Sequence, residues 1–321
     1  MSTSELYQWS EEELQVPLVR RFRLHRDRLD YWQRLRSYYD ENGTLLVLKS
    51  VENALFDREL SAMRLLLAIS SGHNHTIPAE IVPCDKTSLI ITPFLYEIAS
   101  LSWPSLDTLT DGIQQLLEGL KFMHENGIAH FDIHPDNMMV CRKPSLPTSP
   151  LPVQEGKCYF IDFGSSKHLP PPPRGGHGDV CVPYLPFGGH FEPPEGRDRV
   201  NPYAYDIYCM GKSAHNLCVM VSYYALNEPE LACIRVPPAL WEFCSVLSRK
   251  DPKIRPPTSQ TINLLQIAWR WNKMTQWLYW FGPYHLACKF INLSEDRDSV
   301  NLFGWRYMLW LTHSTRQRKG M

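Results

Sequence analysis

The chain has 321 residues, with 33 Lys and Arg side chains against 34 Asp and Glu side chains, so its formal net charge at pH 7 is −1. This balance excludes a global basic field that would recruit nucleic acid or an anionic membrane, and we expect no nucleic-acid partner. Hydrophobic residues make up 44% of the chain and charged residues 21%, which argues against overall disorder. At about 150 residues per domain, the length allows roughly two compact units or one two-lobed domain.

Cysteine usage and the absence of targeting signals point to the inside of the cell. The nine cysteines include no C-x-x-C pair, which argues against a zinc site and a disulfide framework. The N-terminus lacks the basic start and apolar run of a secretory signal, so we expect a cytoplasmic or nuclear protein. The most apolar late stretch, Trp277 to Phe290, is broken by Gly282-Pro283 and is shorter than the ~20 residues of a spanning helix. We therefore expect no transmembrane segment.

The N-terminal part predicts a small sheet with one crossing helix. Seven arginines interleaved with apolar residues predict an amphipathic helix over Val19 to Arg36, within a helical N-terminal extension of residues 1–36. The sequence Asp40-Glu41-Asn42-Gly43 predicts a tight hairpin turn, because Asn-Gly tolerates positive φ. The flanking strands are Tyr38-Tyr39 and Thr44 to Lys49, followed by a helix over Phe56 to Ile69 and strands over Thr76 to Val82 and Ser88 to Leu95.

After Leu95 the pattern becomes mainly helical. Apolar residues from Ile113 to Met123 recur at helical spacing and stop at Gly127. Helical patterning returns over Ala204 to Met220 and Thr258 to Trp271. Two loops rich in Pro and Gly, residues 144–152 and 169–194, flank a short β-like segment at Lys157 to Asp162.

Two short motifs carry the chemistry. The first is His130-Phe131-Asp132-Ile133-His134-Pro135-Asp136-Asn137, and the second is Tyr159-Phe160-Ile161-Asp162-Phe163-Gly164, an apolar strand that places a carboxylate at a glycine turn. A phosphoryl-transfer site needs oxygen ligands for Mg²⁺, an acceptor for the attacking hydroxyl and a cation for the phosphates. Asn137 and Asp162 are the candidate Mg²⁺ ligands, and Asp132 is the candidate acceptor. Lys49 is the candidate cation, which a carboxylate from Glu59 would fix in place.

These motifs resemble those of eukaryotic protein kinases, and they follow the family order from about Asn42 to about Ile267. The chain is similar in particular to the short kinase-like proteins of filamentous fungi. The resemblance implies a two-lobed α+β fold, with a small β-rich lobe at residues 37–95, a larger helical lobe at 96–267 and a Trp-rich C-terminal extension at 268–321. It assigns the catalytic loop to His130-Phe131-Asp132 with Asn137, and the metal-binding turn to Asp162-Phe163-Gly164. Pro193-Pro194-Glu195 would end the activation segment, and Arg255 would be the partner of Glu195. Residues Asp206 to Gly211 would belong to a buried helix.

The resemblance further implies ATP and Mg²⁺ as cofactors and a Ser/Thr hydroxyl of a protein as the acceptor. Adenine would lie between Val47 and Met139, with Thr92 beside the pocket and Leu95 at the end of the hinge. His134 stands where many Ser/Thr kinases carry a lysine. If protonated His134 faces the γ-phosphate, phosphotransfer should rise below about pH 6.5.

One departure from the family pattern leaves other functions open. Kinases cover the phosphates with a glycine-rich loop before the strand lysine, yet residues 1–42 contain no glycine. This loss favours a pseudokinase, a scaffold that keeps the fold without catalysis, whereas the retained Lys49, Asp132 and Asp162 favour catalysis. The motif His-x-Asp-x-His-Pro-x-Asn also resembles the catalytic loop of aminoglycoside and sugar kinases. Glu195 and Arg255 favour the protein-kinase alternative.

The C-terminal extension concentrates tryptophan. Six of the ten tryptophans lie within residues 268–321, at positions 269, 271, 277, 280, 305 and 310. Packing of these side chains on the helical lobe is the simplest interpretation. A protein-docking patch or an interfacial membrane contact is the alternative, because exposed aromatic clusters mark interaction surfaces.

Overall fold

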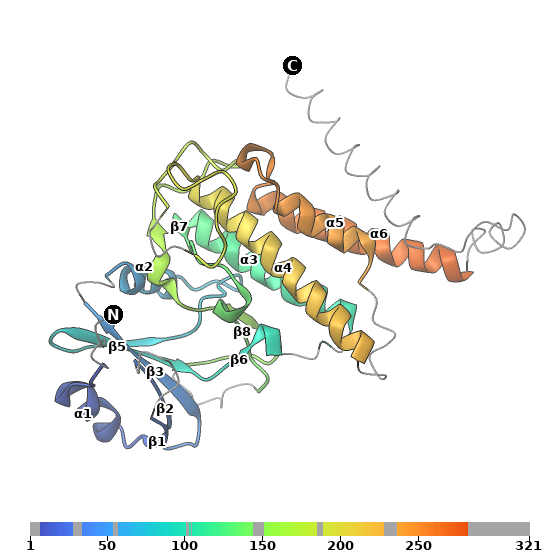
Figure 1. Cartoon of the computed structure of the whole chain (residues 1–321). Coiled ribbons are helices and arrows are strands. Elements are labelled where there is room, and N and C mark those ends of the chain that lie inside the picture. The colour runs from blue at the N-terminus through green and yellow to red at the C-terminus, as the bar shows by residue number, and fades with distance from the viewer. Residues whose placement is uncertain are drawn as a thin grey trace, which may run out of the picture. The chain divides into compact units, whose positions relative to one another are not determined.

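The computed structural model describes residues 7–27, 34–53, 57–100, 103, 105–143, 151–184, 189–227 and 236–281. The chain divides into two compact units (Figure 1). The first unit comprises residues 1–101, 118–172 and 185–190, and the second comprises residues 102–117, 173–184 and 191–321. The N-terminal region is built on a β-sheet and the C-terminal part is helical, which is compatible with a kinase fold.

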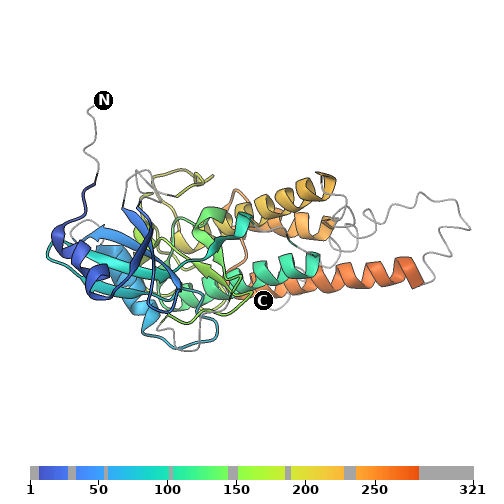
Figure 2. The ribbon, with the colours of Figure 1, turned by 90° about the horizontal axis from the view of Figure 1, so that it is seen from below.

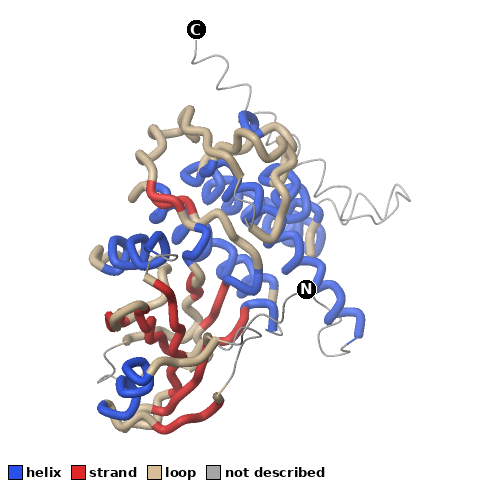
Figure 3. Tube along the Cα trace, turned by 60° about the vertical axis from the view of Figure 1, so that its left-hand side comes forward, coloured by secondary structure: helices blue, strands red, loops and turns tan. Residues whose placement is uncertain are grey.

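A five-stranded antiparallel sheet forms the N-terminal part of the first unit (Figure 3). Its strands are β1 (Arg23–Arg26), β2 (Leu35–Tyr39), β3 (Leu45–Glu52), β4 (Glu80–Pro83) and β5 (Thr87–Pro93), in the spatial order β1-β2-β3-β5-β4. Tyr39 pairs with Leu45, and the Asp40 carboxylate accepts the backbone N–H of Thr44 at 2.7 Å. Gly43 has a φ of +79°, as tight turns require. The predicted hairpin is therefore confirmed.

The helix predicted over Val19 to Arg36 is wrong. Helix α1 (Glu11–Val19) ends where the predicted helix begins, and the chain continues into β1 and β2. All four β1 residues are exposed, and β1 is an edge strand of the sheet. Edge strands commonly carry charged side chains, which explains the arginines that suggested a helix face. The sheet thus includes residues that we had assigned to the N-terminal extension.

Helix α1 packs on one face of the sheet and seals the core there. Ser10 caps α1 through a capping box with Glu13, and the Glu13 side chain is fully buried. Glu13 accepts hydrogen bonds from Ser50 on β3 and, at 2.9 Å, from Thr87 on β5. Trp9, just before α1, joins a core with residues of β2, β3 and β5 and of two loops: Tyr38, Leu46, Leu48, Cys84, Leu89, Ile91 and Leu151. Polar and apolar contacts together fix α1 on the sheet.

Helix α2 (Asp57–Leu67) confirms the helix predicted over Phe56 to Ile69. Its buried side chains Leu60, Met63 and Leu66 recur at helical spacing. Of the strand predicted over Thr76 to Val82, only the end is part of β4, whereas Thr76 makes an isolated parallel bridge to Phe160. The strand predicted over Ser88 to Leu95 is confirmed as β5.

Two small sheets complete the first unit. Strands β6 (Tyr96–Glu97), β8 (Met138–Val140) and β9 (Cys158–Phe160) pair in the order β6-β8-β9, and β7 (Ile128–Ala129) pairs with β10 (Lys167–His168). The predicted helix ending at Gly127 is confirmed as α3 (Leu106–Glu125). Gly127 has a φ of +74°, and a Cβ there would lie 2.3 Å from the Leu169 carbonyl oxygen. Glycine is therefore required at this turn.

The second unit contains the helices α4 (Pro202–Asn227), α5 (Pro238–Leu247) and α6 (Thr258–Phe281). They confirm the helices predicted over Ala204 to Met220 and Thr258 to Trp271, and α6 runs further than predicted. Figure 2 shows α6 beside the first half of α3, where Lys273 Nζ lies 2.8 Å from Asp107 Oδ2. Within the described ranges, no helix combines the length and the hydropathy that crossing a membrane would take. Trp305 and Trp310 of the predicted extension lie outside the described residues.

Candidate active site

Two carboxylates from separate segments of the first unit contact Lys49. Lys49 lies on β3, and its Nζ is 2.7 Å from Oε1 of Glu59 on α2. The same Nζ is 2.9 Å from Oδ1 of Asp162, which follows β9 in the chain. The side chains of Lys49 and Glu59 are 27% and 2% exposed. The lysine is thus held between one buried and one more accessible carboxylate.

These contacts bias the protonation of all three groups. Burial alone would lower the pKa of Lys49, but the carboxylates of Asp162 and Glu59 outweigh it, so the pKa lies above its ordinary value. Burial raises the pKa of Glu59, and Lys49 opposes this rise only in part. Burial would also raise the pKa of Asp162, but Lys49 outweighs it and lowers that pKa. Asp162 is therefore the carboxylate best suited to stay ionised beside a cation.

The backbone around Asp162 is strained and firmly held. Asp162 has a φ of 58°, in the left-handed region, and its carboxylate accepts the backbone N–H of Gly164 at 3.4 Å. The next side chain, Phe163, is fully buried and packs against the ring of His130 with centroids 5.0 Å apart. His130 Nε2 lies 3.0 Å from the carbonyl oxygen of Ile161. His130 is thus a buried residue that packs beside the Asp162 turn, and strain of this kind is common at functional sites.

Asp132 and Asn137, both in the first motif, are joined by hydrogen bonds. Asn137 Nδ2 donates to the carbonyl oxygen of Asp132 at 2.9 Å and to its Oδ2 at 3.2 Å. Immediately before Asp132, Phe131 is fully buried with a φ of 69°, an uncommon conformation for a bulky residue. The backbone N–H of Ile161 donates to the Asn137 carbonyl oxygen at 3.1 Å, which places the Asp162 segment beside this loop.

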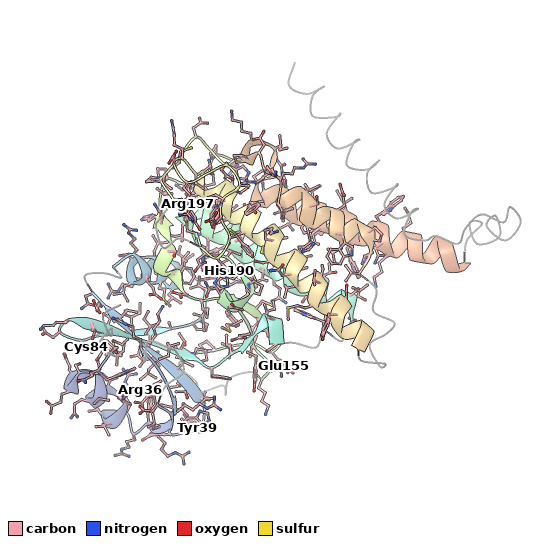
Figure 4. All side chains as sticks on the ribbon, viewed as in Figure 1. Arg36, Tyr39, Cys84, Glu155, His190 and Arg197 are labelled. Carbon is pink, nitrogen blue, oxygen red and sulfur yellow. The ribbon has the colours of Figure 1, made fainter. Side chains whose placement is uncertain are left out.

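His134 and His190 border the Asp132 carboxylate, and Figure 4 labels His190. The backbone N–H of His190 donates to Asp132 Oδ1 at 2.8 Å, and His134 Nε2 lies 3.6 Å from the same oxygen. The two imidazole rings stack with centroids 4.7 Å apart. Sequence reasoning missed His190, because it lies in a Gly- and Pro-rich loop 58 positions from Asp132 and belongs to no motif.

Burial and ion pairing have opposite effects on the pKa values of Asp132 and His134. Burial would raise the pKa of Asp132, but hydrogen bonds from His134 and the His190 backbone lower it below its ordinary value. Burial would lower the pKa of His134, but Asp132 outweighs it and raises that pKa. Asp132 is therefore set up as a carboxylate, and His134 carries a proton to higher pH than a free imidazole. The role of His134 at a γ-phosphate stays a prediction.

Asn137 and Asp162 offer the chemistry that Mg²⁺ prefers. Because Asn137 Nδ2 is bound to Asp132, its Oδ1 is the atom available to a cation. Lys49 contacts Oδ1 of Asp162, which leaves Oδ2 as the metal-facing candidate. Hard oxygen donors, few in number and completed by water and phosphate, are the usual protein contribution to a Mg²⁺ site. The residues therefore fit the ion, although the described residues contain no group of three or more His, Cys, Asp and Glu side chains around one point.

The four predicted adenine-site residues lie in two places: Val47 and Thr92 on the paired strands β3 and β5, and Met139 and Leu95 on or next to the paired strands β8 and β6. Val47 on β3 lies opposite Thr92 on β5, and Thr92 Oγ1 is 3.4 Å from the Val47 carbonyl oxygen. Met139 on β8 lies opposite Glu97 on β6, and Leu95, just before β6, is buried. Cross-strand partners share a face, so Thr92 is on the same side of the sheet as Val47 and Lys49. That these residues line an adenine pocket stays a prediction.

The second unit contains the pair formed by Glu195 and Arg255. The Arg255 guanidinium binds both Glu195 oxygens, at 3.0 and 2.6 Å, and its side chain has no exposed surface. Its remaining N–H groups donate to the carbonyl oxygens of Ala204, Arg249 and Lys250. All five guanidinium donors thus have acceptors, and the predicted partnership of Glu195 and Arg255 is confirmed.

Comparison with known proteins finds partial similarity to protein kinases. No family model matches the chain. It is 31% identical over 112 residues to serine/threonine-protein kinase PTK2/STK2 of Saccharomyces cerevisiae, covering 30% of this chain and 12% of that protein. It is 45% identical over 53 residues to serine/threonine-protein kinase CAK1 of the same yeast, covering 16% and 12%, respectively. It is 28% identical over 131 residues to death-associated protein kinase 2 of Homo sapiens, covering 38% and 31%.

The matched segments span between 12% and 31% of these relatives. Similarity to several protein kinases, modest in identity and partial in coverage, is consistent with a divergent kinase-like domain. This confirms the resemblance that the two motifs indicate.

Proposed function

We propose that the chain is a protein kinase, which transfers the γ-phosphate of Mg-ATP to a Ser or Thr hydroxyl of a protein. The observation that carries this proposal is the meeting of Lys49 with Glu59 and Asp162, beside the bonded pair of Asp132 and Asn137. These residues come from separate segments of the chain, and they are the groups that phosphoryl transfer requires. The relatives' names as serine/threonine-protein kinases favour a protein over a small-molecule substrate.

Each residue has a distinct task under this proposal. Lys49 binds phosphate oxygens, and Glu59 holds its side chain in place. Asn137 and Asp162 hold Mg²⁺, which when bound neutralises charge on the transferred phosphate. Asp132 orients the attacking hydroxyl and accepts its proton late in the transfer. Under the same proposal, residues 37–95 and 96–267 correspond to the two kinase-like lobes, with β1 and the start of β2 added to the smaller one.

A pseudokinase is the second candidate, and two observations favour it. The connection between β1 and β2 contains no glycine, so backbone N–H groups there are poorly suited to approach a triphosphate closely. In addition, the His190 N–H already bonds to Asp132 Oδ1. A pseudokinase would keep the fold and any nucleotide affinity without transfer.

Nucleotide binding followed by a transfer assay separates the candidates. We would measure ATP binding with and without Mg²⁺ for the wild-type protein and for Asp162→Asn, with Asp198→Asn at an exposed position as the matched control. Mg²⁺-dependent binding that Asp162→Asn abolishes, together with transfer to a generic protein, supports the kinase. Binding without transfer selects the pseudokinase. Transfer only to small hydroxyl compounds selects an aminoglycoside- or sugar-type kinase, and no binding rejects every enzyme alternative.

Two finer predictions accompany the proposal. Protein docking through the Trp-rich residues 268–321 stays a prediction, since residues 282–321 lie outside the described part of the chain. A cytoplasmic or nuclear location likewise rests on the sequence alone, and labelling of the protein in cells would test it.

A further inference from the structure

The second unit contains a large cleft that the proposed phosphotransfer site does not use. The cleft has a volume of about 1180 Å³ and is lined by the loop at residues 173–181, by residues 249–257 and by the first turns of α6. We call it the basic cleft, after its lining residues Arg199, Arg249 and Lys253. Arg199 and Lys253 are exposed, whereas Arg249 is half-buried.

Positive charge in the basic cleft is not neutralised locally. Arg255 also lines the cleft, but the Glu195 carboxylate compensates its charge through two hydrogen bonds. Arg199, Arg249 and Lys253 form no ion pair within the described residues, and Asp179 is the other lining carboxylate. Three cations therefore face one carboxylate. Because the whole chain carries a net charge of −1, this is a local concentration of positive charge and not a general surface property.

The walls of the basic cleft are held in place by hydrogen bonds. His177 Nε2 lies 2.9 Å from the Arg255 carbonyl oxygen, and Asn201 Nδ2 donates to the Gly178 carbonyl oxygen at 2.8 Å. Gln260 on α6 contacts the Gly175 carbonyl oxygen at 3.4 Å. These hydrogen bonds hold the loop at residues 173–181 in place, so ligand binding does not have to order this loop.

Apolar side chains line the basic cleft between the cations. Ile254 is 52% exposed, and Leu264 and Ile267 on α6 are half-buried. The cleft is also larger than the ~300–1,000 Å³ of typical small-molecule sites. A single inorganic anion would leave most of this volume and its apolar surface unused. A peptide with both acidic and apolar side chains can use the cations and the apolar wall together.

We propose that the basic cleft binds an acidic, partly apolar peptide segment, and that this segment belongs to the protein substrate. The assignment of this peptide to a substrate rests on the proposed kinase function. The peptide-binding site itself does not depend on that function. The α6 N-terminus at the cleft adds a favourable dipole for negative charge. Binding here would raise the local concentration of a substrate that carries such a segment, without a change in the phosphotransfer residues.

Peptide binding without nucleotide tests this site independently of catalysis. We would measure fluorescence anisotropy of a labelled peptide of alternating Glu and Leu, and of a matched peptide with Lys in place of Glu. The acidic peptide is expected to bind at least about tenfold more tightly, with severalfold weakening from about 50 to about 200 mM NaCl. A chain without kinase activity can still pass this test, so failure of the peptide site and failure of the proposed function are distinguishable.

Charge reversals locate the binding to the cleft. Arg199→Glu and Lys253→Glu should each weaken acidic-peptide binding about three- to tenfold. Lys250→Glu, an equal charge change at an exposed residue that does not line the cleft, should stay within about twofold of wild type. Thermal unfolding would verify that the variants fold. Equal binding of both peptides, an equal loss for Lys250→Glu, no binding of the acidic peptide, or tighter binding of single-stranded oligothymidylate would each overturn the proposal.

Discussion

The Asp132 carboxylate is held by the backbone of His190, a residue 58 positions later in the chain, through a 2.8 Å hydrogen bond to Oδ1. The other oxygen, Oδ2, accepts from Asn137 at 3.2 Å. Both oxygens are thus oriented before any substrate arrives. If Asp132 positions the acceptor hydroxyl, Asp132→Asn should lower kcat by about 10²- to 10⁴-fold, because the proton acceptor is lost. Single-turnover phosphotransfer would measure this rate.

Nucleotide affinity provides the control for the Asp132 substitution. Asp132 is not one of the candidate phosphate or metal ligands, so ATP binding by Asp132→Asn should stay within about threefold of wild type. Asp136→Asn, an exposed carboxylate of the same loop, should leave the transfer rate nearly unchanged. A similar loss of rate in both variants would contradict the assignment of Asp132.

Removal of the Lys49 side-chain charge should affect both function and stability. Lys49→Met leaves the buried Glu59 carboxylate and Asp162 without their shared cation. We expect the free energy of unfolding to fall by about 1–3 kcal/mol, at the low end of buried-pair losses because Lys49 is partly exposed. Phosphotransfer should be lost because the phosphates lose their cation. Urea unfolding and a transfer assay would measure the two effects.

A double variant separates the two roles of Lys49. In Lys49→Met/Glu59→Gln the buried negative charge is removed along with the cation, so much of the stability should return. Activity should not return, since no cation faces the phosphates. Recovered transfer in the double variant would show that Lys49 matters only for folding.

The motif residues could be predicted because their local sequence patterns are strict. One motif is a strand followed by Asp162-Phe163-Gly164, and the other is a loop with Asp132 and Asn137. Each motif is recognisable from a few consecutive residues, so its functional side chains can be assigned from a short segment. The pairing of Glu59 with Lys49 also followed from a simple requirement, since a lysine held near phosphates needs a fixed carboxylate. The local sequence was therefore sufficient to predict these residues of the site.

Two features were missed for physical reasons. Helix α1 begins with Ser10-Glu11-Glu12-Glu13, a capping-box pattern, but the following arginine-rich segment has spacing that suits a helix as well as an exposed edge strand. Tertiary pairing with β2 decided in favour of the strand. The contact between His190 and Asp132 depends on the path of a long loop, and no periodicity or motif encodes such a path.

The buried Glu13 should make stability depend on acidity. Burial alone would raise the pKa of Glu13, but hydrogen bonds, above all from Ser50 and Tyr7, outweigh it and lower that pKa below its ordinary value. Because the folded pKa lies below the unfolded one, near 4.3, the stabilisation is complete above that pH and is lost as the pH falls through the folded pKa. Glu13→Gln should cost about 1–2 kcal/mol at neutral pH.

Urea unfolding at several pH values would check this dependence. The difference in stability between wild type and Glu13→Gln should shrink between about pH 5 and pH 3, where the carboxyl group is protonated. Glu11→Gln, at an exposed position of the same helix, should show little difference at any pH. A constant gap between wild type and Glu13→Gln over this range would argue against the ionised, hydrogen-bonded Glu13.

Close packing of α4 against α5 depends on Gly211. A Cβ at this position would lie 2.5 Å from Ser248 Oγ, 2.6 Å from Leu247 Cβ and 3.0 Å from the Cys244 carbonyl oxygen. Gly211→Ala should therefore force the helices apart and lower stability by about 1–3 kcal/mol, despite the better helix propensity of alanine. Gly72→Ala is the matched control, because nothing lies within 4 Å of a Cβ there. Thermal unfolding of both variants decides the matter: equal melting temperatures would mean that α4 and α5 do not approach this closely in solution.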